Sequence, residues 1–145
     1  MPRKPLRWKK AQVVGLQHDH EHVPTPRSGY TLTMVGVNGY LFGGLDSSIV
    51  PPSASDGLFC VRLSEEVCEW KRLGTPINEA APLARWRHTA TQINTTAILF
   101  FGGYHTHDER LNDCWIFDTI TLGWTRYEWK FSSFLECSVL ARSSV

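Results

Sequence analysis

Short hydrophobic runs separated by polar turns recur along the chain. Residues 28–35 and residues 40–42 each predict a β-strand, because apolar and β-branched residues dominate them and small polar residues bound them. Asn38-Gly39 stands between the two runs and predicts a tight turn, since Asn-Gly readily adopts the positive φ angles of a two-residue hairpin. Two further strands are predicted within residues 60–70, on either side of a polar turn at residues 64–66. The first part of the chain is therefore predicted to form a four-stranded antiparallel sheet.

The same order of elements returns in the second part of the chain. Residues 88–93 and 97–101 predict the first two strands, with Asn94-Thr95 as the turn, and residues 114–124 predict the other two. A repeat of this length is typical of architectures in which each unit is one small sheet and neighbouring units bury their faces against each other. We therefore predict an all-β chain with two four-stranded units.

Equivalent positions of the two units carry the same residue types. They are an arginine before the first strand (Arg27 and Arg85), a glycine pair after the second (Gly43-Gly44 and Gly102-Gly103), and a cysteine ten residues before a tryptophan (Cys60 and Trp70, Cys114 and Trp124). A phosphate-binding loop needs its glycines at the start of a helix, and no helical pattern follows these pairs. We therefore interpret the glycines as strand ends that need a positive φ or a close backbone approach. The tryptophans are interpreted as packing anchors, and the arginines as donors to backbone or neighbouring-unit groups.

In combination these landmarks resemble the kelch-repeat family. The starts Pro26-Arg27-Ser28 and Arg85-Trp86-Arg87, the double glycines, and the third-strand sequence Leu111–Asp118 fit the family's pattern over roughly residues 24–130. The first unit departs from it, because it lacks the Leu-Asn-Asp start of the third strand. The resemblance implies a β-propeller in which each unit is one blade around a central channel. Since propellers usually have four to eight blades, two blades predict a partial kelch-type propeller.

The resemblance divides the chain into six segments. Residues 1–14 are predicted to be a basic N-terminus and an orphan strand, the fourth strand of a partial blade, with Trp8 in the place of Trp70. The remaining segments are a polar His-rich connector at 15–26, blade 1 at 27–74, a connector at 75–84, blade 2 at 85–130, and a divergent tail at 131–145 that starts a third repeat. This layout predicts that further blades, or copies of the same chain, complete the propeller.

Composition and charge narrow the classes of partner. A formal net charge of +1 at pH 7 argues against nucleic acid, which favours strongly basic surfaces. The longest apolar run, residues 97–101, is far too short to cross a membrane. Four cysteines without a CxxC spacing favour free thiols, and no apolar stretch of a secretory signal follows the basic N-terminus. We expect a cytoplasmic protein with no nucleic-acid and no membrane partner.

Two histidine-rich stretches carry the most conspicuous polar side chains. One comprises His18, His20 and His22, and the other comprises His105, His107 and Asp108. In an extended segment the three alternating histidines of the first stretch share one side, and neutral imidazoles at such spacing can bind zinc, copper or nickel. The other interpretation is a solvated loop between blades, since polar loops of this kind are usually only connections. We expect no metal and no cofactor.

The predicted topology places four connections at one rim of the propeller. In a four-stranded meander, the 2–3 loop and the 4–1 loop to the next blade leave the sheet on the same side, which here groups residues 18–22, 45–57, 74–84 and 104–110. The 45–57 connection is either a recognition finger or a disordered insertion. Because function concentrates on loops held by a rigid scaffold, we predict that this rim binds another protein. The predicted contact residues are His18, His20, His22, Asp46, Ser47, Ser48, His105, His107, Asp108 and Arg110.

The sequence contains no recognisable arrangement of a nucleophile, a base and an acid. We therefore predict a non-catalytic protein–protein interaction module that binds its partner through the 2–3 and 4–1 loops. The alternative is a metal-binding, carbohydrate-binding or enzymatic propeller in which the histidines of the two stretches are ligands. The two hypotheses differ in whether purified protein holds metal at an equimolar level.

Overall fold

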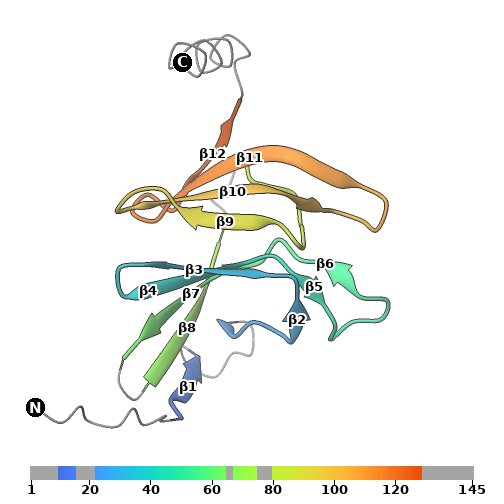
Figure 1. Cartoon of the computed structure of the whole chain (residues 1–145). Helices are drawn as coiled ribbons and strands as arrows, with labels where there is room; N and C mark the ends of the chain where they lie inside the picture. The colour runs from blue at the N-terminus through green and yellow to red at the C-terminus, as the bar shows by residue number, and fades with distance from the viewer. Residues whose placement is uncertain (1–9, 16–21, 65–66, 75–79, 129–145) are drawn as a thin grey trace, which may run out of the picture.

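Two sheets lie face to face and contain most of the strand residues that the structure describes (Figure 1). This computed structural model describes residues 10–15, 22–64, 67–74 and 80–128. Blade 1 consists of β3 (Thr31–Val35), β4 (Asn38–Phe42), β7 (Leu58–Leu63) and β8 (Val67–Leu73). Blade 2 consists of β9 (Thr89–Gln92), β10 (Ala97–Tyr104), β11 (Arg110–Asp118) and β12 (Trp124–Tyr127). The prediction of an all-β fold with two four-stranded antiparallel units is confirmed, and the sheets do not close into a ring.

A fifth strand extends the sheet of blade 1 at its outer edge. β1 (Gln12–Gly15) pairs in parallel with β8, with Gln12 opposite Val67. The orphan strand predicted at the N-terminus is therefore present, and it satisfies backbone donors and acceptors at the edge of β8. That residues 1–14 end a preceding blade stays a prediction. Trp8 lies outside the described residues.

The hairpin turn of blade 1 lies two residues earlier than the sequence predicted. Val35 pairs with Asn38, so the turn is Gly36-Val37, and Asn38 and Gly39 belong to β4. Gly36 has a φ of 61°, which supplies the left-handed conformation that the turn needs. Gly39 is required for packing instead, because a Cβ there would lie 2.9 Å from Cγ1 of Val61.

The two tryptophans on the fourth strands are structurally equivalent, whereas the two cysteines are not. Trp70 pairs with Val61 and Trp124 pairs with Phe117, but the β7–β8 hairpin continues for two more pairs beyond Trp70. Strand pairing therefore aligns Val61 with Phe117. This alignment of the third strands differs by two residues from the alignment that the Cys–Trp spacing gives. The start of these strands shows the same two-residue shift. In blade 1 the Ser55 amide bonds to the Gly44 carbonyl, and at the equivalent place in blade 2 Leu111 pairs with Gly103. Gly57 of blade 1 thus occupies the position of Asp113 in blade 2.

The 45–57 connection is folded rather than irregular. β5 (Leu45–Asp46) and β6 (Ser53–Ala54) form a small three-stranded sheet with β2 (Arg27–Ser28), in the order β2-β5-β6. Asp46 pairs with Arg27 on one side and with Ser53 on the other. The connection is therefore an ordered projection of blade 1.

The core lies between the two blades and is built from aromatic rings. Phe42 of blade 1 and Phe100 and Phe117 of blade 2 are almost fully buried. The Trp124 ring lies 5.1 Å from Phe42, 5.1 Å from Phe100 and 4.9 Å from Phe117, measured between ring centroids. Tilted contacts at this spacing are favourable for aromatic pairs, and each ring also buries a large apolar surface. The stacking of the blades is therefore an aromatic interface.

A buried histidine connects the blades inside this interface. Nε2 of His88 lies 2.7 Å from the Thr31 hydroxyl of blade 1, and its ring lies edge-on to Phe42. Burial, together with the nearby charge of Arg85, lowers the pKa of His88 from 6.5 to about 4. The imidazole is therefore neutral in the folded protein at neutral pH.

We predict that the fold loses stability in mild acid because of His88. Below about pH 6.5 the unfolded chain takes up a proton that folded His88 does not accept until about pH 4, so unfolding becomes more favourable as the pH falls through this window. The free energy of unfolding should fall by about 2 kcal/mol between pH 7 and 5, measured with urea. His88→Gln, which cannot titrate, should remove most of this slope. An equal slope in the variant would contradict the prediction.

Gly43 lies where the two blades come closest along the backbone. Its φ is 68°, and a Cβ at this position would collide with the carbonyl oxygen of Arg85. The neighbouring Gly44 amide donates a hydrogen bond to that carbonyl at 2.8 Å. The glycine pair therefore lets the chain entering blade 2 lie directly against blade 1.

A comparison of two glycines separates this close approach from backbone strain. Gly36 has a similar φ of 61°, but a Cβ added there would meet nothing within 4 Å. Gly36→Ala should cost about 1–2 kcal/mol, because only the left-handed conformation is penalised. Gly43→Ala should cost about 1–3 kcal/mol more, because the methyl group also displaces Arg85. Equal costs in urea unfolding would show that the close approach is unimportant.

Candidate functional site

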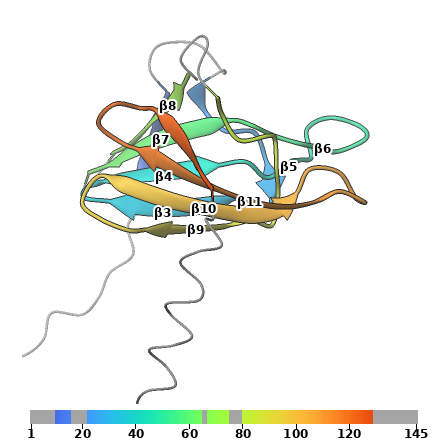
Figure 2. The same ribbon diagram turned by 90° about the horizontal axis from the view of Figure 1, so that it is seen from above.

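Three connections meet at one end of the stacked blades (Figure 2). In both views the β5–β6 loop and the β10–β11 connection project from the same end, opposite the β3–β4 and β9–β10 turns. Hydrogen bonds join both of these to the third connection, the segment that enters blade 2. The Arg85 amide donates to Ser55 O at 3.1 Å, and Nδ1 of His105 lies 2.7 Å from Ala84 O. We call this end the rim.

The polar residues of the first rim loop mainly organise the loop itself. Asp46 accepts a hydrogen bond from the Thr25 hydroxyl at 2.6 Å, and from the amide and hydroxyl of Ser48 at 2.9 and 2.6 Å. The bonds from Ser48 and Thr25 lower the pKa of Asp46 to about 2. The Ser47 hydroxyl donates to Pro26 O at 2.9 Å. Of the predicted contact residues, these three therefore hold the loop against the segment before β2.

The histidines take separate positions. His105 is tied to Ala84, and the His107 ring lies edge-on to Trp86 with centroids 5.7 Å apart. His22 is partly buried, and His18 and His20 lie outside the described residues. Within the described ranges, no group of three or more His, Cys, Asp or Glu side chains is placed to hold a metal ion.

At the rim, two predicted contact residues, His107 and Arg110, join three residues that the sequence did not single out as contacts. We call this group the Arg–aromatic cluster: Trp86, Arg87, Tyr104, His107 and Arg110. The backbones of Trp86 and Tyr104 exchange two hydrogen bonds, of 3.0 and 2.8 Å, and their rings lie 5.3 Å apart. The Arg87 guanidinium lies 4.8 Å from the Trp86 ring, and that of Arg110 lies 5.4 Å from the Tyr104 ring. Both arginines are exposed, and neither forms an ion pair with a described residue. The cluster therefore presents two stacked cations to solvent.

Arg87 is held in an unusual backbone conformation. Its φ is 52°, in the left-handed region, and its amide donates a 2.7 Å hydrogen bond to Gly29 O of blade 1. A non-glycine residue in this region carries strain, and such strain concentrates at functional positions. No local sequence signal marks Arg87, because the contact that fixes it comes from the other blade.

The arginine that begins blade 2 is fully buried and fully bonded. Nη1 of Arg85 donates to Gly102 O at 3.0 Å and to Oδ1 of Asp113 at 2.7 Å, and Nη2 donates to Oδ2 of Asp113 at 2.9 Å. Nε1 of Trp115 donates to the same carboxylate at 2.7 Å. Burial acts to raise the pKa of Asp113, but the bonds from Arg85 and Trp115 outweigh it and hold the pKa below its usual value.

Arg27 of blade 1 has the same bonds to the backbone but lacks the paired carboxylate. Its Nη1 donates to Gly43 O at 3.1 Å, as Arg85 donates to Gly102. The nearest carboxylate is Asp46, whose Oδ2 lies 3.8 Å from Nη2. That distance is too long for a hydrogen bond. Its guanidinium lies instead over the Phe59 ring, 5.2 Å from the centroid.

Trp70 lies beside an apolar hollow on the face of blade 1 that points away from blade 2. This hollow, of about 310 Å³, is lined by Pro24, Thr25, Pro26, Arg27, Tyr30, Leu32, Leu41 and Trp70. Trp124, the counterpart of Trp70, is buried against blade 1. The hollow face of blade 1 is therefore equivalent to the face of blade 2 that forms the interface between the blades.

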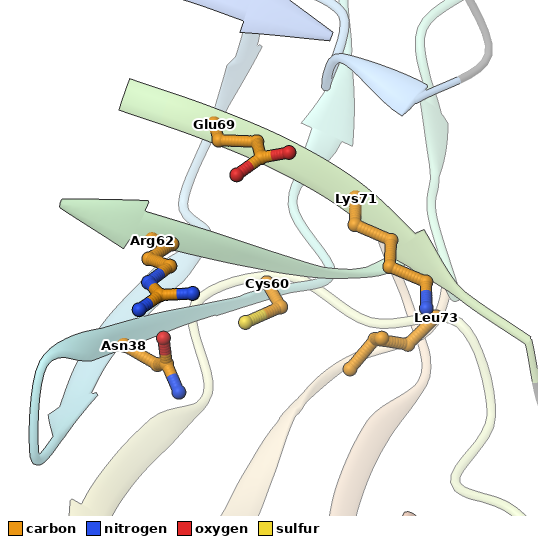
Figure 3. A pocket seen from close by; sticks show the side chains of 6 residues that line it. All are labelled: Asn38, Cys60, Arg62, Glu69, Lys71 and Leu73. Atoms are coloured by element: carbon orange, nitrogen blue, oxygen red, sulfur yellow. The ribbon is translucent and has the colours of Figure 1, made fainter. Parts of the chain in front are cut away.

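A second hollow of blade 1 does not have the chemistry of a catalytic centre (Figure 3). It has a volume of about 300 Å³ and is lined by Asn38, Cys60, Arg62, Glu69, Lys71 and Leu73, from β4, β7 and β8. Burial raises the pKa of the Cys60 thiol, so the sulfur stays protonated at neutral pH and is a weak nucleophile.

No helix of sufficient length and apolar character to span a bilayer occurs in the described part of the chain.

Stacked four-stranded meanders with aromatic faces, with a glycine pair just after the second strand of blade 1 and near the end of that of blade 2, are consecutive blades of a β-propeller. The KLHDC2/KLHL20/DRC7 Kelch-repeats domain matches residues 4–139. The chain belongs to the kelch-repeat family, whose domains generally serve as protein-interaction modules.

Curated relatives carry this segment within much longer chains. The chain is 33% identical over 106 residues to the flagellar outer-arm dynein alpha chain of Chlamydomonas reinhardtii, covering 72% of this chain and 2% of the dynein. It is 32% identical over 106 residues to an F-box/kelch-repeat protein of Arabidopsis thaliana, covering 69% and 21%. It is 29% identical over 101 residues to mouse Kelch domain-containing protein 1, covering 70% and 23%. The chain thus spans less than a quarter of each of these relatives.

We predict that the Arg85–Asp113 pair is essential for folding. Asp113→Asn removes the charge partner of a fully buried guanidinium and should cost about 3–5 kcal/mol, measured by urea unfolding. Asp108→Asn is the matched control, because Asp108 is an exposed rim carboxylate, and it should change stability by less than about 0.5 kcal/mol. Similar costs for both variants would contradict the assigned role of the pair.

Proposed function

We propose that this chain is a protein-interaction segment of a kelch propeller and that its rim binds the partner protein. The observation that supports this best is the Arg–aromatic cluster, where two exposed guanidiniums lie over aromatic rings at the junction of two rim connections. Arginine, tryptophan and tyrosine are the residue types enriched at the energetic centres of protein interfaces. The cluster joins these residue types on a scaffold that both blades hold.

Pre-organisation of the cluster supports the same proposal. A stacked guanidinium keeps its fork of N–H donors in a fixed plane, so less side-chain freedom is lost when it binds. Arg87 is further restricted by its backbone bond to Gly29. Neither Arg87 nor Arg110 bonds to a carboxylate in the described part of the chain, so both can donate to acceptors of a partner.

Seven of the ten predicted contact residues, all except His18, His20 and His22, then divide into two groups. Asp46, Ser47, Ser48 and His105 shape the rim through bonds within it. His107, Asp108 and Arg110 are exposed on the β10–β11 connection, where a partner reaches them directly.

We also propose that the apolar hollow of blade 1 stacks against a further kelch blade, from a longer chain or a second copy. The equivalent face of blade 2 packs on blade 1 in this way.

Selection from a displayed peptide library against the 145-residue chain tests the rim directly. Arg87→Ala combined with Arg110→Ala should weaken the selected peptides by about thirty-fold, or about 2 kcal/mol, the size expected at an interface centre. Arg126→Ala, an exposed arginine on β12, is the matched control and should leave affinity unchanged. Peptides that bind both variants as tightly as the original chain would exclude the cluster as the binding surface.

A further inference from the structure

The two blades hold equivalent arginines in the same orientation. Nε of Arg27 donates to Thr25 O and Nε of Arg85 donates to Leu83 O, both at 3.0 Å. In each blade Nη1 then donates to the carbonyl of the first glycine of the pair. Blade 2 therefore shows what an arginine fixed in this way binds next, which is both oxygens of the Asp113 carboxylate.

Blade 1 lacks a side chain at the position of that carboxylate. Ser55-Asp56-Gly57 corresponds to Leu111-Asn112-Asp113, because Ser55 and Leu111 make equivalent backbone pairs with the glycines. Gly57 thus stands where Asp113 stands in blade 2. The nearest replacement is the Ser55 hydroxyl, which accepts from Nη1 of Arg27 at 3.1 Å but carries no charge.

The place of the missing carboxylate is a cavity. It has a volume of about 170 Å³, and its lining includes Arg27, Asp46, Ser55, Gly57, Phe59 and Arg72. This is several times the roughly 30 Å³ that one water molecule occupies in the liquid. The two guanidiniums approach the Phe59 ring at 5.2 and 5.9 Å from its centroid. Arg72 is exposed, so the cavity is reached from solvent.

The charge in this cavity is unbalanced. Arg27 has a side chain only 5% exposed, and its nearest carboxylate oxygen is 3.8 Å away. That carboxylate, Asp46, already accepts bonds from Thr25 and Ser48. Arg72 has no ion pair in the described part of the chain. Two guanidiniums therefore face one carboxylate, whose ion pair with Arg27 is too long for a hydrogen bond, and an anion that enters the cavity gains charge-assisted hydrogen bonds.

We infer that this cavity, lined by Arg27, Arg72, Ser55 and Gly57, binds a carboxylate of the partner protein, which takes the place that Asp113 holds in blade 2. The inference rests on the proposed function, since the partner supplies the carboxylate. The planar fork of Arg27 fits two oxygens in the bidentate arrangement already seen at Arg85 when one of them replaces the Ser55 hydroxyl at Nη1. Nη2 keeps its 2.7 Å bond to the Thr25 hydroxyl and donates its second N–H to the other oxygen. Arg72 adds a second cation from the solvent side.

Titration of the isotope-labelled chain with small carboxylates tests the inference without the partner. Acetate should shift the amide resonances of Ser55 and Gly57 in a saturable way, and acetamide, its neutral analogue, should not. A capped peptide, Ac-Gly-Glu-Gly-NH₂, should bind at least tenfold more tightly than its Gln counterpart. Ac-Gly-Gly-Gly-OH presents only a terminal carboxylate, so its affinity relative to the Glu peptide shows which source of carboxylate the cavity prefers.

Three variants locate the site. Gly57→Asp places an internal carboxylate in the cavity and should abolish acetate binding. The backbone of Gly57 is outside the left-handed region, and the nearest atom to an added Cβ is Cε2 of the Phe59 ring, at 2.8 Å, so this ring must shift slightly to admit the side chain. Arg72→Gln removes an exposed cation and should weaken binding at least fivefold. Arg62→Gln, on the hollow of Figure 3, is the matched control and should have no effect.

The inference is overturned if acetate gives no saturable shift at Ser55 and Gly57, or if the shift persists unchanged in Gly57→Asp. It fails separately from the proposed function. Peptides selected on the rim that depend on Arg87 and Arg110 but are indifferent to Gly57→Asp would leave the rim as the binding surface and remove the carboxylate cavity from it. Acetate binding at Gly57 alongside peptides indifferent to Arg87 and Arg110 would do the reverse.

Discussion

Arg85 is the residue on which the relation between the two blades depends. Its amide donates to Ser55 and its carbonyl accepts from Gly44, so its backbone is bonded to blade 1. Its guanidinium is bonded to Gly102 and Asp113, so its side chain is fixed in blade 2. Because the residue is fully buried, none of these bonds competes with water, and removing one leaves a buried group unsatisfied. The side chain of Arg85 and the two peptide units that flank it thereby fix blade 2 against blade 1, beside the aromatic interface.

The rim follows from this arrangement. The chain that leads into Arg85 passes between the projection of blade 1 and the β10–β11 connection, where Ala84 contacts His105. Two residues follow Arg85 at the rim. Trp86 stacks on Tyr104, and Arg87 adopts its left-handed conformation. The bonds that place one blade against the other therefore also hold the Arg–aromatic cluster in position.

The sequence predicted most of the features that recur in each repeat. It did not predict the features that depend on strand pairing or on contacts between the two blades. The strands and the double glycines follow from local patterns, because each is decided by residues that are neighbours in sequence. The turn at Gly36-Val37 was missed, since Asn38-Gly39 is locally the stronger turn signal and packing against Val61 places Gly39 in the strand. The equal Cys–Trp spacing concealed a two-residue shift that only strand pairing shows. Of the site, topology grouped the rim loops and with them His107 and Arg110, but the place of Arg87 depends on a contact with Gly29 and had no local signal.

That two-residue shift also changes how the difference between the blades is understood. Under the Cys–Trp alignment, blade 1 simply has a divergent third strand. With Gly57 in the place of Asp113, the divergence includes the loss of one carboxylate, while the arginine that would bind it retains its bonds to the backbone. Arg27 also lines the apolar hollow on which we propose that a further blade stacks. A carboxylate bound to Arg27 and a blade packed on that hollow therefore meet at one guanidinium, so each changes the environment in which the other binds. If both proposals hold, ligand binding at the rim and completion of the propeller are linked through this residue.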